Sequence, residues 1–165
     1  MKKHYLIMLG ILASMGALAQ DNYSFTTRTE NYTEMTSGTV ISDSDWDDFE
    51  VRMAMPFAFK YFGESVDSIT IADDGLYFTT EFDDYLSPHG QDAVARGADM
   101  SPVSYRIDGT GSNRILKVQW PNITFVDTKD GFVGDFVNYQ VWMYEGTNVI
   151  EFHIGSSFVS EGALA

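Results

Sequence analysis

Apolar and polar residues alternate with a period of two through most of this chain, and this alternation restricts the fold more than any other feature of the sequence. The clearest example is the run 114–120, whose apolar members are Leu116, Val118 and Trp120. Lys117 and Gln119 occupy the positions between them. Because successive side chains of a β-strand point to opposite faces, the pattern predicts a strand with one face in a core and the other toward water.

Two further runs of this kind, residues 136–144 and 149–154, follow toward the C-terminus. In the second run, the side chains expected in the core are Ile150, Phe152 and Ile154. Glu151 and His153 are expected to face water. The residues between the two runs, 145–148, include a glycine at a position that tight hairpin turns favour, so the two strands are predicted to form a hairpin.

Turn-forming residues predict two more hairpins. One joins 68–71 to 76–79 through Asp73-Asp74-Gly75, and the other joins 103–107 to the 114–120 strand. Additional strands are expected at 23–27, 50–55 and 57–61, and helix is limited to a turn or two around 91–96. About ten short strands with so little helix predict an all-β fold, namely an antiparallel β-sandwich, with a jelly-roll order of strands as one option.

Residues 1–19 have the order of a cleavable secretory signal: Lys2 and Lys3, then an apolar run, then Ala17-Leu18-Ala19. The apolar run is shorter than the roughly 20 residues that a membrane-spanning helix needs, so cleavage after Ala19 is expected, with no membrane span in the mature chain. The predicted division is a signal peptide at 1–19, a β-sandwich domain at 20–155 and a tail or truncated linker at 156–165. Export would bring the mature protein to the periplasm, the cell surface or the extracellular medium.

Charge and cysteine content limit the partners and the chemistry. Removing Lys2 and Lys3 from the formal net charge of −14 leaves −16 for the mature chain. So acidic a protein repels phosphate backbones, which excludes nucleic acid as a partner class. The chain has no cysteine, so thiol chemistry is excluded, and the fold must rest on its core or on bound ions.

Several strand and turn segments share a pattern with known proteins. These segments are SPVSYR (101–106), GT (109–110), NRILKVQW (113–120), NYQVWMYEGTNVIE (138–151), PFAFKYFG (56–63) and DGLYF (74–78). In them the chain resembles the N-terminal β-sandwich domain of secreted Bacteroidetes proteins of the type IX secretion group. That resemblance implies a β-sandwich in a modular exported protein, and its motifs carry no chemistry. Such proteins usually end in a C-terminal sorting domain; none follows Ile154, so the chain is expected to be a fragment of a longer protein or to reach its compartment by another route.

Two groups of acids are candidates for a calcium site. The first is Asp43, Asp45, Asp47 and Asp48, beside Trp46, and the second is Asp127, Asp130 and Asp135. Calcium takes about six to eight oxygen ligands, and loop carboxylates supply them. The first group begins like a helix-loop-helix calcium loop but has Asp48 where that loop needs glycine and Ala54 where it needs glutamate. Calcium binding by either group is one hypothesis, and a solvated acidic loop is the alternative.

Patterns that would support catalysis do not occur in the sequence. Zinc needs three or four ligands, and the mature chain offers only His89 and His153, with no zinc-type spacing. No serine lies in a Gly-x-Ser-x-Gly elbow. Glycoside hydrolysis needs two carboxylates about 5–10 Å apart, and no pair stands out among the acids. We therefore assign no catalytic residue.

Two tryptophans are candidates for ligand binding. Trp46 lies in an acidic segment, and Trp142 falls on a strand face that also carries Asn138 and Gln140. Exposed flat rings near polar groups can stack on sugars or pack against a partner domain. The alternative for both rings is burial, which is the commoner state of tryptophan.

These observations favour a non-enzymatic extracytoplasmic interaction or accessory module of a secreted or surface protein. A carbohydrate-binding module, stabilised by calcium, is the alternative, so the partner would be another protein domain or a glycan. A hydrolase domain is a weaker alternative, because a sandwich fold by itself does not indicate a function. The oligomeric state stays open.

Overall fold

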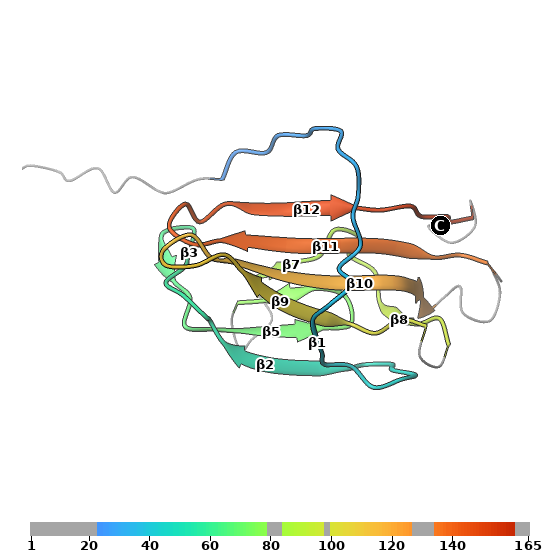
Figure 1. The fold of residues 1–165 in the computed structure, drawn as a ribbon. Helices are drawn as coiled ribbons and strands as arrows, with labels where there is room; N and C mark the ends of the chain where they lie inside the picture. Colours follow the sequence, from blue (N-terminus) through green and yellow to red (C-terminus); the bar gives the residue numbers. More distant parts are fainter. Residues whose placement is uncertain (1–22, 79–83, 98–99, 127–133, 161–165) are drawn as a thin grey trace, which may run out of the picture.

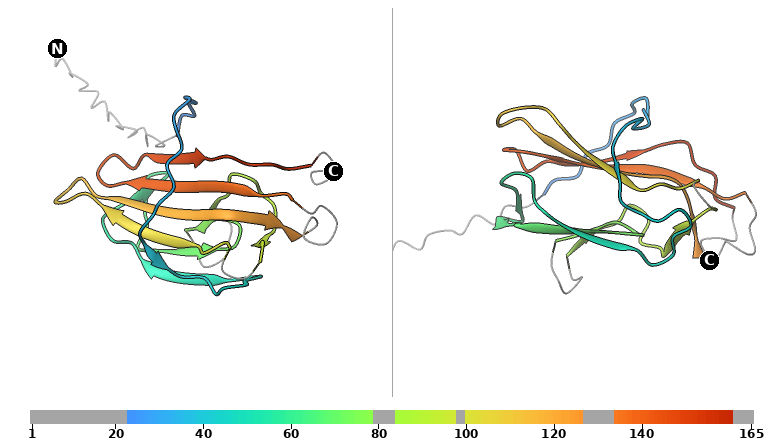
Figure 2. Two further views of the ribbon diagram at one scale, coloured as in Figure 1. Left: turned by 45° about the vertical axis from the view of Figure 1, so that its right-hand side comes forward. Right: turned by 60° about the horizontal axis from the view of Figure 1, so that its bottom comes forward.

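The computed structural model describes residues 23–78, 84–97, 100–126 and 134–160, so the expected signal peptide at 1–19 lies outside the described residues. Two layers of antiparallel strands face each other, as the right-hand view of Figure 2 shows. The prediction of an all-β antiparallel sandwich is therefore confirmed, with twelve strands in the described part of the chain. No helix in that part is both long and apolar enough to cross a membrane.

The main sheet has six strands in the order β1-β9-β10-β11-β12, with β8 attached to β10 (Figure 1). Their bounds are Thr39–Val40 (β1), Ala93–Ala95 (β8), Ser104–Asp108 (β9), Ile115–Phe125 (β10), Val137–Tyr144 (β11) and Ile150–Ile154 (β12). Strands β9 to β12 pair in chain order, as a meander. The pairs Asp108↔Ile115 and Met143↔Ile150 confirm two of the predicted hairpins.

The second sheet has four strands in the order β2-β5-β6-β7. Their bounds are Glu50–Ala54 (β2), Ser68–Ala72 (β5), Leu76–Tyr77 (β6) and Tyr85–Leu86 (β7). A separate small hairpin consists of β3 (Lys60–Tyr61) and β4 (Glu64–Ser65). The predicted turn between β5 and β6 is confirmed, because the Ala72 N–H donates to the Gly75 carbonyl at 2.9 Å.

The core lies between the two sheets and follows the predicted alternation. Its apolar members from β10 and β11 that are at most 1% exposed are Leu116, Val118, Trp120, Ile123, Val137, Tyr139, Val141 and Met143. Trp120 spans the core, since its indole Nε1 donates to the Ala72 carbonyl of the second sheet at 2.9 Å. Its ring stacks on Tyr139 at a centroid distance of 4.7 Å. Large aromatic side chains buried in this way contribute much of the apolar area that stabilises a domain.

The outer face of the main sheet is covered, contrary to the prediction that it faces water. Residues 32–38, which we call the strap, cross this face on the way to β1 (Figure 1). Gln119 and Gln140 lie beneath the strap and are 2% and 1% exposed. The Met35 N–H donates to Gln119 Oε1 at 2.6 Å, and Gln140 Nε2 donates to the Thr33 carbonyl at 2.9 Å. These bonds permit burial of two amides that would otherwise be costly to desolvate.

Strand β12 forms the edge of the main sheet, and its burial is the reverse of the prediction. Phe152 and Ile154 are 37% and 51% exposed, whereas the Glu151 and His153 side chains are only 18% exposed. Glu151 pairs with Arg28 of the N-terminal segment at 2.8 Å. The prediction for these four residues is wrong because the N-terminal segment covers the outer side of the edge strand, while nothing among the described residues fully covers its inner side.

Three other local predictions differ from the structure. Residues 23–27 form no strand, and only Lys60–Tyr61 of the range 57–61 is a strand. The expected helical turn around 91–96 contains β8 instead, which pairs with β10 at 123–125. This pairing is available because β9 covers only 115–119 of the long β10, and a bulge between Trp120 and Ile123 follows.

The first residues of the expected tail are bonded to the segment that precedes β11. Phe136 and Phe158 exchange two backbone hydrogen bonds of 2.8 Å. Asp135, at 3% exposure, accepts hydrogen bonds from the Ser160 N–H and from its hydroxyl at 2.9 Å. Phe158 and Ser160 are therefore attached to the segment that leads into β11.

Candidate functional site

Trp46 lies in the core and not on the surface. Its side chain is 3% exposed, its Nε1 donates to the Ser101 carbonyl at 2.7 Å, and its ring packs edge-on against Phe49. A backbone bridge between Asp47 and Val94 holds this segment against β8. A ring in this position has no free face on which a sugar could stack.

Trp142 stands on the outer face of the main sheet, between two polar neighbours. Lys117 Nζ lies 3.5 Å from the ring centroid, and the His153 ring is stacked on Trp142 at 3.9 Å. Lys117 is on β10 and His153 on β12, which flank β11 on opposite sides, so they cover the two faces of the indole. Its Nε1 donates to Gln140 Oε1 at 2.7 Å. Trp142 is thus part of a cation–π and hydrogen-bond network, and its stacking surfaces are occupied.

Among the described residues, Asp43, Asp45, Asp47 and Asp135 belong to no group of acids close enough to hold a metal ion, and of the acids proposed from the sequence only Asp48 does. Asp43, Asp45 and Asp47 are exposed. Asp127 and Asp130 lie outside the described residues. Asp135 is buried and used by Ser160, as described above.

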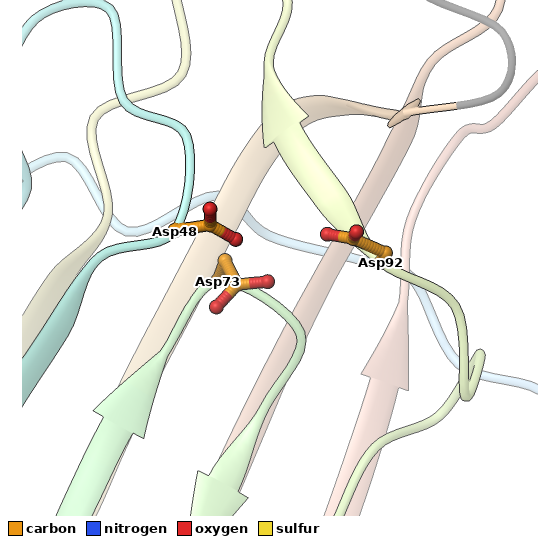
Figure 3. A group of neighbouring side chains, drawn as sticks. All are labelled: Asp48, Asp73 and Asp92. Atoms are coloured by element: carbon orange, nitrogen blue, oxygen red, sulfur yellow. The ribbon is translucent and has the colours of Figure 1, made fainter.

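A different set of acids converges at one end of the sandwich, namely Asp48, Asp73 and Asp92 (Figure 3). One carboxylate oxygen of each lies within 4.8 Å of the others. Asp48 immediately precedes the β2 region, Asp73 is in the β5–β6 turn, and Asp92 is next to β8. Strand pairing brings these segments together, since Glu50 pairs with Ala72 and Asp47 bridges to Val94.

Sequence reasoning missed this group. The sequence grouped Asp48 with Asp43, Asp45 and Asp47 as a candidate calcium ligand, and not with Asp73, although Asp73 lies in a turn that the sequence predicts correctly. No signal in the sequence connects Asp92 to either of them, because their proximity depends on which strands pair across the sheets.

The environment of Asp73 makes its charge unfavourable. Burial, followed by the neighbouring charge of Asp74, raises the pKa of Asp73 to about 7. The carboxylates of Asp92 and Asp48 act in the same direction. No ion pair joins a lysine or arginine to Asp48 or Asp73 within the described residues. Like charges in a partly desolvated site favour protonation or a bound cation.

Two buried polar atoms lie beneath this end of the sandwich. The Tyr139 hydroxyl, on a side chain 1% exposed, and His89 Nε2 have no hydrogen-bond partner within the described residues. The two rings contact each other with centroids 5.4 Å apart. Burial, and then the charges of Asp74 and Asp73, raise the pKa of Tyr139. Burial lowers the pKa of His89.

The basic side chains are engaged elsewhere, mainly on the outer face of the main sheet. The ion pairs there are Arg106–Asp108 at 2.6 Å, Lys117–Asp108 at 2.9 Å and Arg28–Glu151 at 2.8 Å. At the end of the β10–β11 hairpin, Arg114 pairs with Glu145 at 2.7 Å and also donates to the Pro56 carbonyl. The pKa of Asp108 is lowered, chiefly by its hydrogen bond from Arg106. Polar groups on this face are therefore largely paired with one another, which suits a structural network better than a ligand site.

The chemistry open to the converging acids is that of oxygen ligands. Three carboxylates without a nitrogen or sulfur donor suit a hard cation such as calcium, and not zinc. His89 and His153 belong to no metal-binding group within the described ranges. His153 instead contacts Glu151 at 3.0 Å.

Comparison with known proteins adds one match. A family model described as NIDO related matches residues 22–164, most of the chain. No curated protein and no solved structure shows significant similarity to this chain.

Proposed function

This chain belongs to the NIDO-related family, and from that premise we propose that it is a non-enzymatic module of an exported protein that binds another polypeptide. The family indicates an interaction module of the extracellular type. The resemblance to N-terminal domains of type IX cargo agrees with such a role. We propose that the partner is an extended polypeptide segment and that the edge of the main sheet binds it.

The observation that carries the proposal is the exposed edge of the main sheet at β12. Phe152, Ile154 and Phe158 are large apolar side chains that are 37%, 51% and 57% exposed along this edge. Large apolar side chains that share one margin of a soluble domain are typical of a protein-binding surface.

The backbone of β12 also has groups available for pairing. Val149 and Gly155 face β11, because the Val149 carbonyl accepts from Tyr144 and the Gly155 N–H donates to Asn138. Antiparallel residues alternate in direction, so the N–H and C=O groups of Ile150, Phe152 and Ile154 point away from β11. An extended peptide can add to such an edge as a further strand.

The chain's own N-terminal segment does not complete this sheet. Residues 23–32 run beside β12 in Figure 1, and side chains attach them. The Tyr23 hydroxyl donates to the Asn148 carbonyl at 3.0 Å, and Arg28 pairs with Glu151. Within the described residues, no backbone hydrogen bond joins this segment to β12.

The charge of the chain indicates what kind of partner fits. A net charge of −14 makes two copies repel each other and attracts cationic segments. We therefore expect an extended partner segment in which apolar residues alternate with lysine or arginine.

A peptide-binding experiment tests this proposal. The probe is a short peptide of alternating valine and lysine, with a valine–glutamate peptide of equal length as its control. Binding to the basic peptide should slow amide hydrogen exchange at Phe152 and Ile154. Ile154→Pro should abolish binding, because it removes an outward N–H without disturbing a bond to β11, whereas Ile154→Thr should retain it.

Three results would overturn the proposal. Equal binding by Ile154→Pro and Ile154→Thr would show that strand addition is not the mode. Equal binding of the acidic peptide would remove the argument from charge. A glycan-array signal unaffected by Ile154→Pro, with no peptide binding, would favour the carbohydrate-binding alternative instead.

A further inference from the structure

We propose that Asp48, Asp73 and Asp92 form a calcium site that ties together three separate segments of the sandwich (Figure 3). The oxygens that these residues offer lie within 4.8 Å of one another. Calcium–oxygen distances are about 2.3–2.6 Å, so two ligands of one ion can be separated by at most about 5.2 Å. The three carboxylates therefore fit around a single ion without rearrangement of the backbone.

The fold holds these acids in place independently of any ion. The Glu50↔Ala72 pair positions Asp48 near Asp73, and the Asp47–Val94 bridge positions it near Asp92. A bound ion would thus join the loop before β2, the β5–β6 turn and the segment before β8. These elements belong to both sheets, so the ion would brace the two layers against each other.

Electrostatics at the site favour a cation. Asp48 and Asp73 have no ion pair with a lysine or arginine within the described residues. Three carboxylates whose oxygens lie this close together repel one another when they are ionised. A divalent cation would relieve this repulsion and leave all three groups ionised.

The Tyr139 hydroxyl is a second observation, independent of the acids. It is buried and has no partner within the described residues. The Tyr139 ring lies parallel to Trp120, with an interplanar angle of 11°, and Trp120 reaches the Ala72 carbonyl beside Asp73. The Tyr139 ring therefore lies on the core side of the turn that carries Asp73. A water molecule in the coordination shell of the ion would give this hydroxyl the hydrogen-bond partner that a buried group needs.

Calcium suits this donor set better than magnesium. The ligands come from loops and turns, and calcium accepts irregular geometry with six to eight oxygens, whereas magnesium needs a near-ideal octahedron. Three carboxylates with water completing the shell suggest the affinity of extracellular calcium modules, with a Kd of about 0.1–1 mM.

The proposal is tested on the mature chain by calorimetric titration with CaCl2 and by thermal unfolding in 10 mM CaCl2 or in EDTA. Wild type should bind one ion, and calcium should raise its Tm by about 3–10 °C. Asp73→Asn and Asp92→Asn should weaken binding at least about tenfold and lose most of the Tm shift. Tyr139→Phe should weaken binding severalfold. The matched control is Asp45→Asn, an exposed acid of the neighbouring loop, which should behave as wild type.

The substitution of Asp73 is expected to leave the protein folded. Asp73→Asn removes one of three carboxylates that lie within 4.8 Å of one another, so it should fold in EDTA at least as stably as wild type. The same calcium shift in wild type, Asp73→Asn and Asp92→Asn would overturn the site. Loss of binding in Asp45→Asn would move the site to the loop at 43–47 and also overturn it. A magnesium shift equal to that of calcium and insensitive to Asp73→Asn would indicate general screening of acids, which contradicts the proposal.

Discussion

Replacing Gln140 with leucine should detach the strap from the outer face of the main sheet. Gln140 is 1% exposed and connects three parts of the chain through its side-chain amide. Its Nε2 donates to the Thr33 carbonyl at 2.9 Å and to Gln119 Oε1 at 2.7 Å, and its Oε1 accepts from Trp142 Nε1 at 2.7 Å. Leucine has a similar volume, so the change removes these bonds without opening a large cavity.

The expected loss of stability follows from the three bonds. Each hydrogen bond contributes a net of about 0.5–1.5 kcal/mol, and a buried group left unpaired costs more. Gln119 Oε1 keeps its bond from the Met35 N–H, and Thr33 is exposed enough to bind water. The free energy of unfolding should therefore fall by about 2–4 kcal/mol.

Urea denaturation of a small set of variants measures this effect. Gln119→Leu should cost a similar amount, and the double variant should cost about 1 kcal/mol less than the sum, because both single changes break the same Gln119–Gln140 bond. Gln91→Leu, at an exposed position, is the control and should stay within about 0.5 kcal/mol of wild type. In Gln140→Leu, hydrogen exchange at the Met35 amide should accelerate because the strap opens locally.

Two results would refute this reasoning. A loss below about 0.5 kcal/mol in both single variants would mean that the amides do not contribute to stability. Strict additivity, with unchanged exchange at Met35, would mean that the two glutamines and the strap are not one unit.

Three further predictions concern a turn, the core and pH. Gly109→Ala should lower the Tm more than Gly111→Ala. The φ angle is positive at both glycines, 84° at Gly109 and 65° at Gly111, but an added Cβ meets the backbone across the turn at Gly109 and meets nothing within 4 Å at Gly111. Equal losses of Tm would contradict this. Trp46→Phe should cost about 1–3 kcal/mol in urea denaturation, since it removes the buried indole bond to Ser101; an unchanged midpoint would show that the bond is not needed. Burial lowers the pKa of His89, so the unfolded state binds more protons than the folded state below about pH 6.5, and the free energy of unfolding should decrease as the pH drops below that value. His89→Phe should reduce this pH dependence. An unchanged pH profile in the variant would contradict the prediction.

The candidate calcium site shows where reasoning from sequence stops. The acid-rich loop drew attention to Asp43, Asp45, Asp47 and Asp48, which are neighbours in the chain, but only Asp48 belongs to the group that converges in the fold. The acids that converge come from positions 48, 73 and 92, and only strand pairing brings their oxygens within 4.8 Å. Local density of charge is visible in a sequence, whereas convergence across two sheets is not.

The sequence by itself determined the longer strands β10, β11 and β12, the turns of three hairpins and the buried face of β10 and β11, because side-chain direction alternates along any strand. It could not determine which outer faces stay open. Gln119 and Gln140 are buried because a strap from a distant part of the chain crosses them, and Phe152 is exposed because β12 lies at the sheet edge. Trp46 is buried although its neighbours in sequence are acids, because a bridge to β8 holds its segment against the core. Alternation along a strand is local, but whether a face is covered depends on which other segment packs on it, and only the tertiary structure decided that.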